Sequence, residues 1–305
     1  MTSLTKKLLQ MKVSLQNNGK PNSVMKQVGF TLIELSIVLV IIGLIVGGVL
    51  VGQDLIKAAE IRATVSQYEK YNAAMNTFRT KYNGIPGDLL SANATAFGLT
   101  ASTGATGLGD GNGLITDTSS STAPIGEPLL LWRQLSDANL IDGSYGAVNS
   151  TVGLQATTGV VGSNVTPSYY LPSAKMGRGN LWLAGADTGL NYYGLVAVTA
   201  ISTTAYTKVA GTGGITPIEA FNIDTKLDDG SPNSGTVQAR DGSTTVAPIF
   251  LSVSGTNAAA PGGTSATEAT TSCQLGTVAT ATTNTYARGT TAGNAPNCAL
   301  RLRFN

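Results

Sequence analysis

The chain has 305 residues with a formal net charge of +2; only 12% of the residues are charged, and 37 are glycine. It contains no histidine, which excludes a Ser-His-Asp triad, a Cys-His dyad and every histidine-ligated metal site. The sequence has no basic patch that would indicate nucleic acid as a partner. The composition suits a loop-rich extracytoplasmic domain with β-strands better than a cytosolic enzyme.

Charge is distributed unevenly along the chain. The segment before Phe30 contains five lysines and no acidic residue, so the rest of the chain is mildly acidic. Lysines that precede an apolar segment favour the cytoplasmic side of a membrane. We therefore predict a cytoplasmic N-terminus, with everything after the segment on the opposite side.

That segment, residues 32–51, is apolar except for Glu34 and Ser36, and about 20 such residues can cross a hydrocarbon core of about 30 Å. A secretory signal peptide normally has a shorter apolar region followed by a small-x-small cleavage site. A plain signal anchor explains the length but not Glu34, because an ionised carboxylate at that depth costs roughly 2.5–3.5 kcal/mol. An acid at this position therefore indicates a function.

Residues 26–35, Lys-Gln-Val-Gly-Phe-Thr-Leu-Ile-Glu-Leu, resemble the processing site of type IV prepilins and type II secretion pseudopilins. The resemblance implies that a membrane peptidase cuts between Gly29 and Phe30 and N-methylates Phe30. It also implies that Glu34 pairs with the terminal amine of a neighbouring subunit during assembly. Residues 25–29 alone would make a complete short leader. Residues 1–24 are therefore either the first part of an unusually long leader or the result of a start codon assigned too early.

The same resemblance implies a pilin-like α+β fold, with one long N-terminal helix over about residues 30–82 packed on a head of antiparallel strands and long loops. The expected division is a removed leader (1–29), a transmembrane and filament-core segment (30–52), the amphipathic half of the helix (53–83) and an extracytoplasmic head (84–305). The implied location is the bacterial inner membrane, as a single span, and then a periplasmic or cell-surface filament.

Apolar residues continue beyond the span at steps of three and four, which predicts one face of an amphipathic helix: Ile61, Val65, Tyr68, Tyr71, Met75, Phe78 and Tyr82. Residues 83–87 then end the helix, with Gly84 as the expected C-cap and Pro86 unable to continue it.

The rest of the chain predicts short elements in loops rich in glycine, serine, threonine and alanine (100–124, 143–168 and 254–292). A short amphipathic helix is expected to begin at Glu127, with Glu127 to Leu135 as its main part, and to end near residues 139–143. A second is expected from Thr216, which has capping-box spacing to Glu219, to about Leu227. Four strands are expected, at 179–184, 192–201, 246–253 and 298–304. In the last of these, leucine and phenylalanine alternate with arginine.

The chain has two cysteines, Cys273 and Cys298, both near the C-terminus. In an exported domain they are expected to form a disulfide, the alternative being two unrelated buried thiols. Two acidic loops near glycine, 110–113 and 224–230, have two interpretations, a calcium site or a solvated turn. Neither has EF-hand spacing, and calcium is considered mainly at Asp224, Asp228 and Asp229. Apart from calcium, no cofactor is expected.

The leading functional prediction is a structural subunit of a pilus-like filament or pseudopilus. Its partners would be copies of itself, other pilins, prepilin peptidase, the inner-membrane assembly platform and, before assembly, membrane lipid. A minor or tip pilin acting as an adhesin or ligand-binding module, and a plain membrane-anchored periplasmic protein, are the alternatives. An enzyme is not predicted, because no nucleophile, base and oxyanion site converge in the sequence.

Overall fold

The computed structural model describes residues 31–101, 109–116, 126–146, 148–149, 153–154, 166–187, 189–201, 209–241, 273–275, 285–289 and 293–304. The chain divides into two compact units, Met1–Gly52 and Gln53–Asn305, and helix α1 (Leu32–Tyr82) contributes to both. Gly29 and Phe30 lie outside the described residues.

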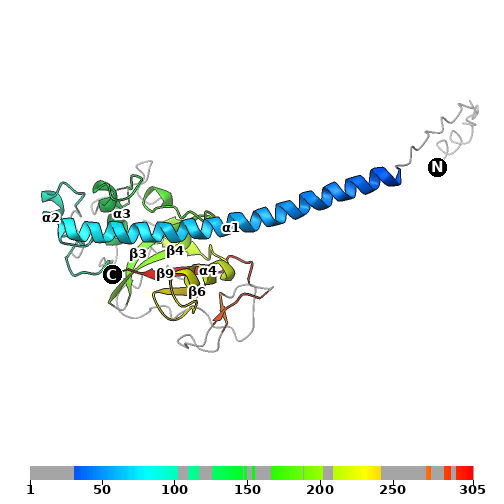
Figure 1. The fold of residues 1–305 in the computed structure, drawn as a ribbon. Coiled ribbons are helices and arrows are strands. Elements are labelled where there is room, and N and C mark those ends of the chain that lie inside the picture. Colours follow the sequence, from blue (N-terminus) through cyan, green and yellow to red (C-terminus); the bar gives the residue numbers. More distant parts are fainter. Residues whose placement is uncertain are drawn as a thin grey trace, which may run out of the picture. The chain divides into compact units, whose positions relative to one another are not determined.

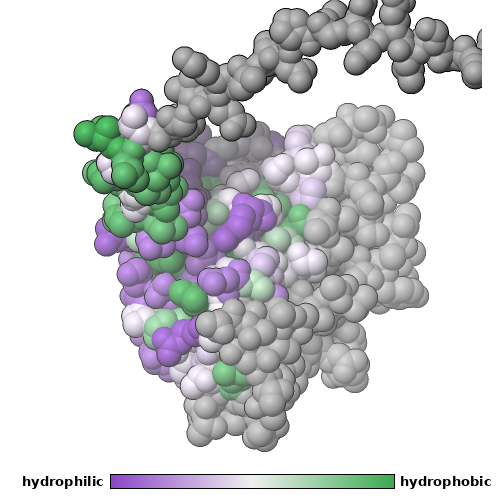
Figure 2. All heavy atoms as spheres, turned by 90° about the vertical axis from the view of Figure 1, so that its right-hand side faces the viewer, coloured by the Kyte–Doolittle hydropathy of each residue, from purple (hydrophilic) through white to green (hydrophobic). Residues whose placement is uncertain are grey.

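The part of α1 in the first unit has apolar side chains on all sides. The large hydrophobic residues from Leu32 to Val51 are each at least 50% exposed, and they belong to the group of apolar side chains coloured green in Figure 2. A helix satisfies its backbone hydrogen bonds internally, which is the condition for crossing a bilayer. By length and composition, α1 is able to cross a membrane.

In the second unit, α1 buries the predicted stripe. Ile61, Tyr71, Met75, Phe78 and Tyr82 are buried, and the two other stripe residues pack against the same core. The helical periodicity is therefore confirmed along the whole stripe, and the face it defines is the one that contacts the head.

The expected C-cap of α1 was wrong by one residue. Asn83, not Gly84, has the left-handed conformation, with φ 52°, and its N–H donates to the Arg79 carbonyl at 2.9 Å. Asparagine tolerates this region better than most residues. A Cβ on Gly84 would lie 2.6 Å from Leu89 Cδ1, so a larger residue there would force the Leu89 side chain to move.

The head contains an antiparallel sheet of order β3-β4-β9-β6, with β5 paired to β4 (Figure 1). Its strands are β3 (Asn180–Asp187), β4 (Leu190–Ile201), β5 (Val209–Thr212), β6 (Val237–Asp241) and β9 (Cys298–Arg303). Three of these match predicted strands, whereas β5 and β6 were not predicted. The predicted strand at 246–253 lies outside the described residues.

The remaining elements are short. They are α2 (Ser91–Ala96), α3 (Glu127–Asp137), β1 (Val148–Asn149), β2 (Gly153–Leu154), η1 (Pro167–Tyr169), α4 (Pro217–Leu227), β7 (Gln274–Leu275) and β8 (Thr285–Tyr286). Strands β1 and β2 form one antiparallel pair, and β7 and β8 form another. Together with α1 and the sheet, these elements confirm the predicted α+β class.

An aromatic cluster fills the space between α1, α3 and the sheet. The ring of Tyr71 lies 5.0 Å from Trp132 and 5.7 Å from Trp182, and Tyr193 stacks on Phe304 at 4.2 Å. Such pairs contribute about 0.5–1.5 kcal/mol each beyond their buried area. They fix the amphipathic half of α1 against the sheet.

Hydrogen bonds from side chains of α1 also hold the helix against the head. Gln67 of α1 accepts from Trp182 Nε1 at 2.9 Å and donates to the Ser173 carbonyl at 2.9 Å. The Tyr68 hydroxyl donates to the Arg303 carbonyl at the end of β9, at 2.7 Å. The helix is thus bonded to both an edge strand and the C-terminal strand.

The two faces of β9 alternate as predicted. Leu300 and Leu302 are fully buried on the face toward the core. On the other face Arg301 is also buried, at 7% exposed; it bonds Asp187 at 2.5 Å and lies over the ring of Tyr192. Both faces of this strand are therefore covered.

Candidate functional site

Glu34 lies in the first turn of α1 and is hydrogen-bonded to Thr31, the residue directly before the helix. Its Oε2 accepts from the backbone N–H of Thr31 at 2.8 Å and from the Thr31 hydroxyl at 2.7 Å, while Glu34 N donates to the Thr31 hydroxyl at 3.3 Å. This is a capping box. Among the described residues, the carboxylate therefore bonds its own N-cap through Oε2, and Oε1 has no partner there.

Thr31 was not among the predicted functional residues, although the sequence contained the signal. Threonine followed three residues later by glutamate, before an apolar run, is the pattern of a capping box. The motif was interpreted only through processing and assembly. The structure adds that Thr31 orients the carboxylate on which assembly is expected to depend.

The two cysteines form a disulfide. Cys273 and Cys298 have their Cα atoms 5.0 Å apart, and both are fully buried. Cys298 is the first residue of β9 and Cys273 directly precedes β7. The bond therefore connects the central part of the sheet to the β7–β8 pair.

The predicted calcium residues come together at the end of α4. Asp224, Asp228 and Asp229 each offer an oxygen within 4.8 Å of the others. Asp224 is fully buried, and burial, with the two neighbouring aspartates adding to it, raises its pKa to about 7. Three carboxylate oxygens this close can either share protons or bind a hard cation.

These oxygens also accept hydrogen bonds from the chain. Asp224 accepts from the Tyr286 hydroxyl at 2.7 Å and from Gly230 N at 3.1 Å. Asp228 accepts from the backbone N–H groups that begin β6, and Asp229 accepts from Ser231 N at 2.8 Å. The group therefore joins α4 to β6 and β8 whether or not a cation binds.

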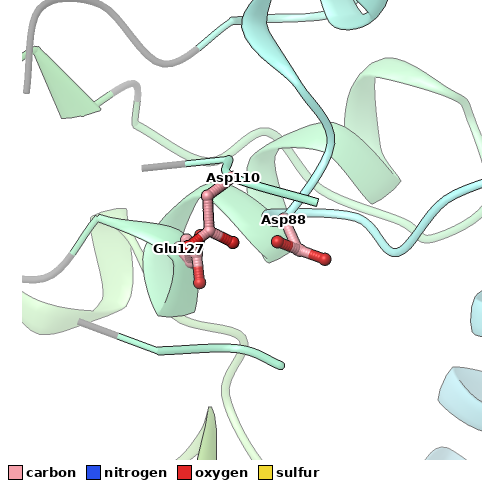
Figure 3. A group of neighbouring side chains, drawn as sticks. All are labelled: Asp88, Asp110 and Glu127. Atoms are coloured by element: carbon pink, nitrogen blue, oxygen red, sulfur yellow. The ribbon is translucent and has the colours of Figure 1, made fainter. Parts of the chain in front are cut away.

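A second acidic group was not predicted. Asp88, Asp110 and Glu127 come from three separate segments: the turn after α1, the 109–113 loop and the first residue of α3 (Figure 3). Their oxygens also lie within 4.8 Å of one another, and Asp88 and Glu127 are buried. The loop around Asp110 had been interpreted mainly as a solvated turn.

Backbone N–H groups of the glycine-rich loop surround these carboxylates. Asp88 accepts from Gly111 N at 2.8 Å and Gly113 N at 2.8 Å. Glu127 accepts from Gly109 N at 2.8 Å and Thr116 N at 2.7 Å. The backbone of the loop thus surrounds the two buried acids, while Asp110, Gly111 and Asn112 themselves are exposed to solvent.

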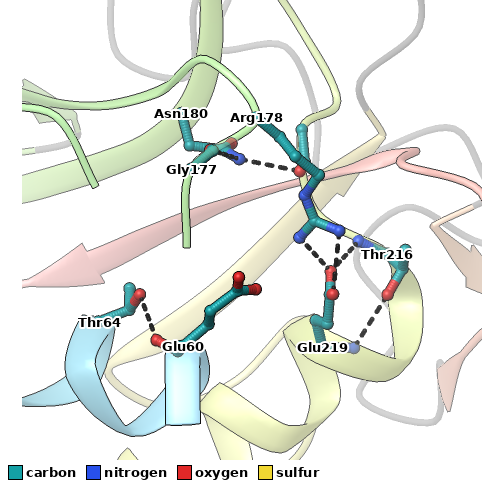
Figure 4. A network of polar contacts seen from close by, with 8 residues as sticks. Glu60, Thr64, Gly177, Arg178, Asn180, Thr216 and Glu219 are labelled. Carbon is teal, nitrogen blue, oxygen red and sulfur yellow. Dashed lines mark hydrogen bonds and ion pairs between the residues drawn. The ribbon is translucent and has the colours of Figure 1, made fainter. Parts of the chain in front are cut away.

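Burial raises the pKa of Glu127 to about 8, against the lowering effect of these two N–H bonds and with Asp88 and Asp110 adding to the rise. Glu219, in α4, is a useful contrast. Burial alone would raise its pKa, but the guanidinium of Arg178, at 2.6 Å, and the N–H of Thr216 lower it below the usual value (Figure 4). Glu219 with Thr216 also completes the predicted capping box of α4, which is confirmed.

We expect the stability of the head to fall as pH rises. Because Glu127 has a higher pKa in the folded chain (about 8) than in the unfolded chain (about 4.3), the folded state binds the extra proton. Its contribution is most favourable at low pH and is lost progressively between those two values, with a slope of at most about 1.4 kcal/mol per pH unit. Urea unfolding of the full chain in detergent, with a chelator present, measures this slope.

The variant Glu127→Gln is the matched control, since it is neutral at every pH. Its NH2 group cannot accept one of the two backbone N–H bonds, so it should be less stable than the wild type near pH 4.5, but its unfolding free energy should fall less steeply between pH 4.5 and 8. Parallel pH profiles for the two chains would show that Glu127 is ionised in the folded state and would contradict the prediction.

Comparison with known proteins supports the N-terminal interpretation. A family model described as "Prokaryotic N-terminal methylation motif" matches residues 25–50. This stretch is the prepilin-type cleavage and methylation segment of type IV pilins and pseudopilins. No curated protein matches the chain, and no solved structure matches it. The matched segment points to a structural protein, and together with the apolar half of α1 it is consistent with membrane anchoring.

Proposed function

We propose that this protein is a structural subunit of a type IV pilus-like filament or pseudopilus, processed by prepilin peptidase and assembled through α1. The observation that carries the proposal is the methylation segment at residues 25–50, which includes the start of α1 and nearly all of its exposed apolar side chains up to Val51. An exposed apolar surface of that kind is removed from water either by lipid or by other copies of the same helix.

The chemistry of processing supports the same conclusion. Cleavage between Gly29 and Phe30 creates an α-amino group, which is largely protonated at neutral pH. In the filament this amine would meet Glu34 of a neighbouring chain, where a low dielectric makes pairing matter most. An uncut chain has no such amine, so assembly would depend on processing.

The head favours a minor or tip-located subunit as the second candidate. Removal of the leader leaves a mature chain that runs from Phe30 to Asn305, which is longer than a compact repeating unit needs. A head of this size would suit an adhesin or ligand-binding module, and we propose no enzymatic activity for it. Immunogold labelling of sheared filaments decides between these roles: labelling along the length supports the repeating subunit, and labelling at the end supports the tip protein.

The central test is the mature N-terminus. Mass spectrometry should find a chain that begins at Phe30 and is one methyl group heavier than its sequence mass. Gly29→Leu should leave the full-length precursor in the membrane, because a bulky side chain would obstruct the peptidase. A mature terminus near Ala58 would identify a signal peptide instead and would overturn the proposed function.

We further propose that calcium binds at Asp224, Asp228 and Asp229, which is supported by their three convergent oxygens. A ligand that binds only the folded chain stabilises it by about 2.7 kcal/mol at one hundred times its Kd. The melting temperature should therefore rise in calcium relative to EDTA, and Asp229→Asn should remove most of the rise. Asp110→Asn, in the other acidic group, is the control and should keep it. Equal melting temperatures of the wild type in calcium and EDTA would exclude the site.

A further inference from the structure

Two Asn-Gly pairs lie in the described part of the chain, Asn83-Gly84 and Asn112-Gly113. Asparagine is a thermolabile residue, and a following glycine exposes the backbone nitrogen because it has no Cβ. That nitrogen can attack the asparagine side-chain carbonyl, with loss of ammonia. The local chemistry is the same in both pairs, so the folded structure decides which of them reacts.

Asn83 is free to react. It is exposed, and within the described segments its side chain has no hydrogen-bond partner. Its backbone N–H donates to the Arg79 carbonyl, which fixes the main chain but leaves the side-chain amide unrestrained. Gly84 N likewise has no partner among the described residues. Both reacting groups, the side-chain Cγ of Asn83 and the nitrogen of Gly84, are thus unrestrained.

Asn112 is restrained at both ends of its amide. Its Oδ1 accepts from Leu114 N at 2.7 Å, and its Nδ2 donates to Asp110 Oδ2 at 2.9 Å. The nitrogen that would attack, Gly113 N, donates to Asp88 Oδ2 at 2.8 Å. The carboxylate of Asp88 stabilises this proton on the nitrogen, and the attack requires its removal.

We propose that Asn83, at the C-terminal end of α1, is a site of spontaneous deamidation in the folded protein and that the acidic loop protects Asn112. Water or hydroxide removes the proton from Gly84 N, which forms a bond to Cγ of Asn83. The side-chain nitrogen leaves as ammonia, and a five-membered succinimide remains. Water then opens either carbonyl of the ring, which yields aspartate or isoaspartate, and no oxidant or reductant is needed.

The modification would weaken the end of α1. Either product places a new negative charge at the C-terminus of a helix, where the macrodipole disfavours it. Isoaspartate also adds a methylene to the main chain at a position with φ 52°. The next residue, Gly84, packs so closely on Leu89 that even a Cβ would be 2.6 Å from Cδ1. The last turn of α1 should therefore fray in aged protein.

The test follows both sites in one sample of the full chain in detergent, kept at mildly alkaline pH. Cleavage before aspartate places Asn83 on the peptide of residues 54–87 and Asn112 on that of residues 110–116. The isoaspartate product keeps the same peptide with a mass increase of about one dalton, and the aspartate product adds a cut before residue 83 or 112. We expect Asn83 to deamidate roughly tenfold or more faster than Asn112, because several hydrogen bonds must break before Asn112 can react.

The same chain unfolded in urea is the control, and there the two rates should become similar. The variant Asp110→Ala, which frees Asn112 Nδ2 and places Asn112 on the peptide of residues 88–116, should raise the rate at Asn112 and leave that at Asn83 unchanged. Equal rates in the folded chain, or an Asn83 that reacts only after unfolding, would overturn the proposal.

Discussion

Replacing Glu34 by valine should leave expression, cleavage and membrane insertion nearly normal but sharply reduce incorporation into filaments. In a single chain the carboxyl only adds a cost to insertion, so its loss is neutral or mildly favourable there. In a filament the variant would strand the buried terminal amine of a neighbour, and breaking one side of such a pair costs about 3–5 kcal/mol. The measurement is the ratio of sheared-filament to membrane-bound protein.

The contact between Glu34 and Thr31 makes a second variant necessary. Glu34→Val also removes a capping box, and the loss of a cap costs about 0.5–2 kcal/mol. Glu34→Gln retains an acceptor for the Thr31 donors but has no charge. If the charge matters, both variants fail to assemble; if only the cap matters, glutamine assembles and valine does not.

Wild-type assembly by both variants would show that Glu34 is not paired as proposed. It would favour a plain membrane anchor or a terminal subunit that needs no partner. Because cleavage at Gly29 is measured separately, this outcome would not by itself overturn the assignment of the methylation segment.

Removing the disulfide should cost the head roughly 3 kcal/mol of unfolding free energy, since the bond joins cysteines with a sequence separation of 25 and so closes a long loop. The double variant Cys273→Ala/Cys298→Ala is preferred to serine, because both sites are fully buried and an unpaired hydroxyl would add its own cost. Urea unfolding of the full chain in detergent measures the difference.

Reductant provides the control for this experiment. It should lower the stability of the wild type toward that of the double variant and leave the variant unchanged. Titration of two free thiols in the unfolded, unreduced wild type would contradict the disulfide directly.

The helices were predicted well because their signals are local. The stripe from Ile61 to Tyr82 and the capping-box spacing of Thr216 and Glu219 are properties of neighbouring residues, and the structure has both. The end of α1 at Tyr82 was predicted correctly, but the left-handed position after it was assigned to Gly84 instead of Asn83, because asparagine and glycine both tolerate positive φ. That a side chain at residue 84 would meet Leu89 is visible only in the folded structure.

Strand β6 was missed because its sequence, Val-Gln-Ala-Arg-Asp, is short and has one β-branched residue and no aromatic residue to favour a strand. It becomes a strand by pairing with β9, where Val237 faces Leu302 and Ala239 faces Leu300. Pairing of this kind depends on a partner that is distant in the sequence, which no local pattern contains.

The sequence by itself determined the N-terminal features of this protein: the lysine-rich segment before Phe30, the apolar span, Glu34 and the methylation segment. These features are contiguous, and the function proposed for them depends on lipid and on neighbouring chains rather than on the fold of the head. Only the tertiary structure decided the acidic group of Asp88, Asp110 and Glu127, whose members come from three segments. Burial raises the pKa of Asp88 and of Glu127, and burial is a property of the packed head that residue spacing does not reveal.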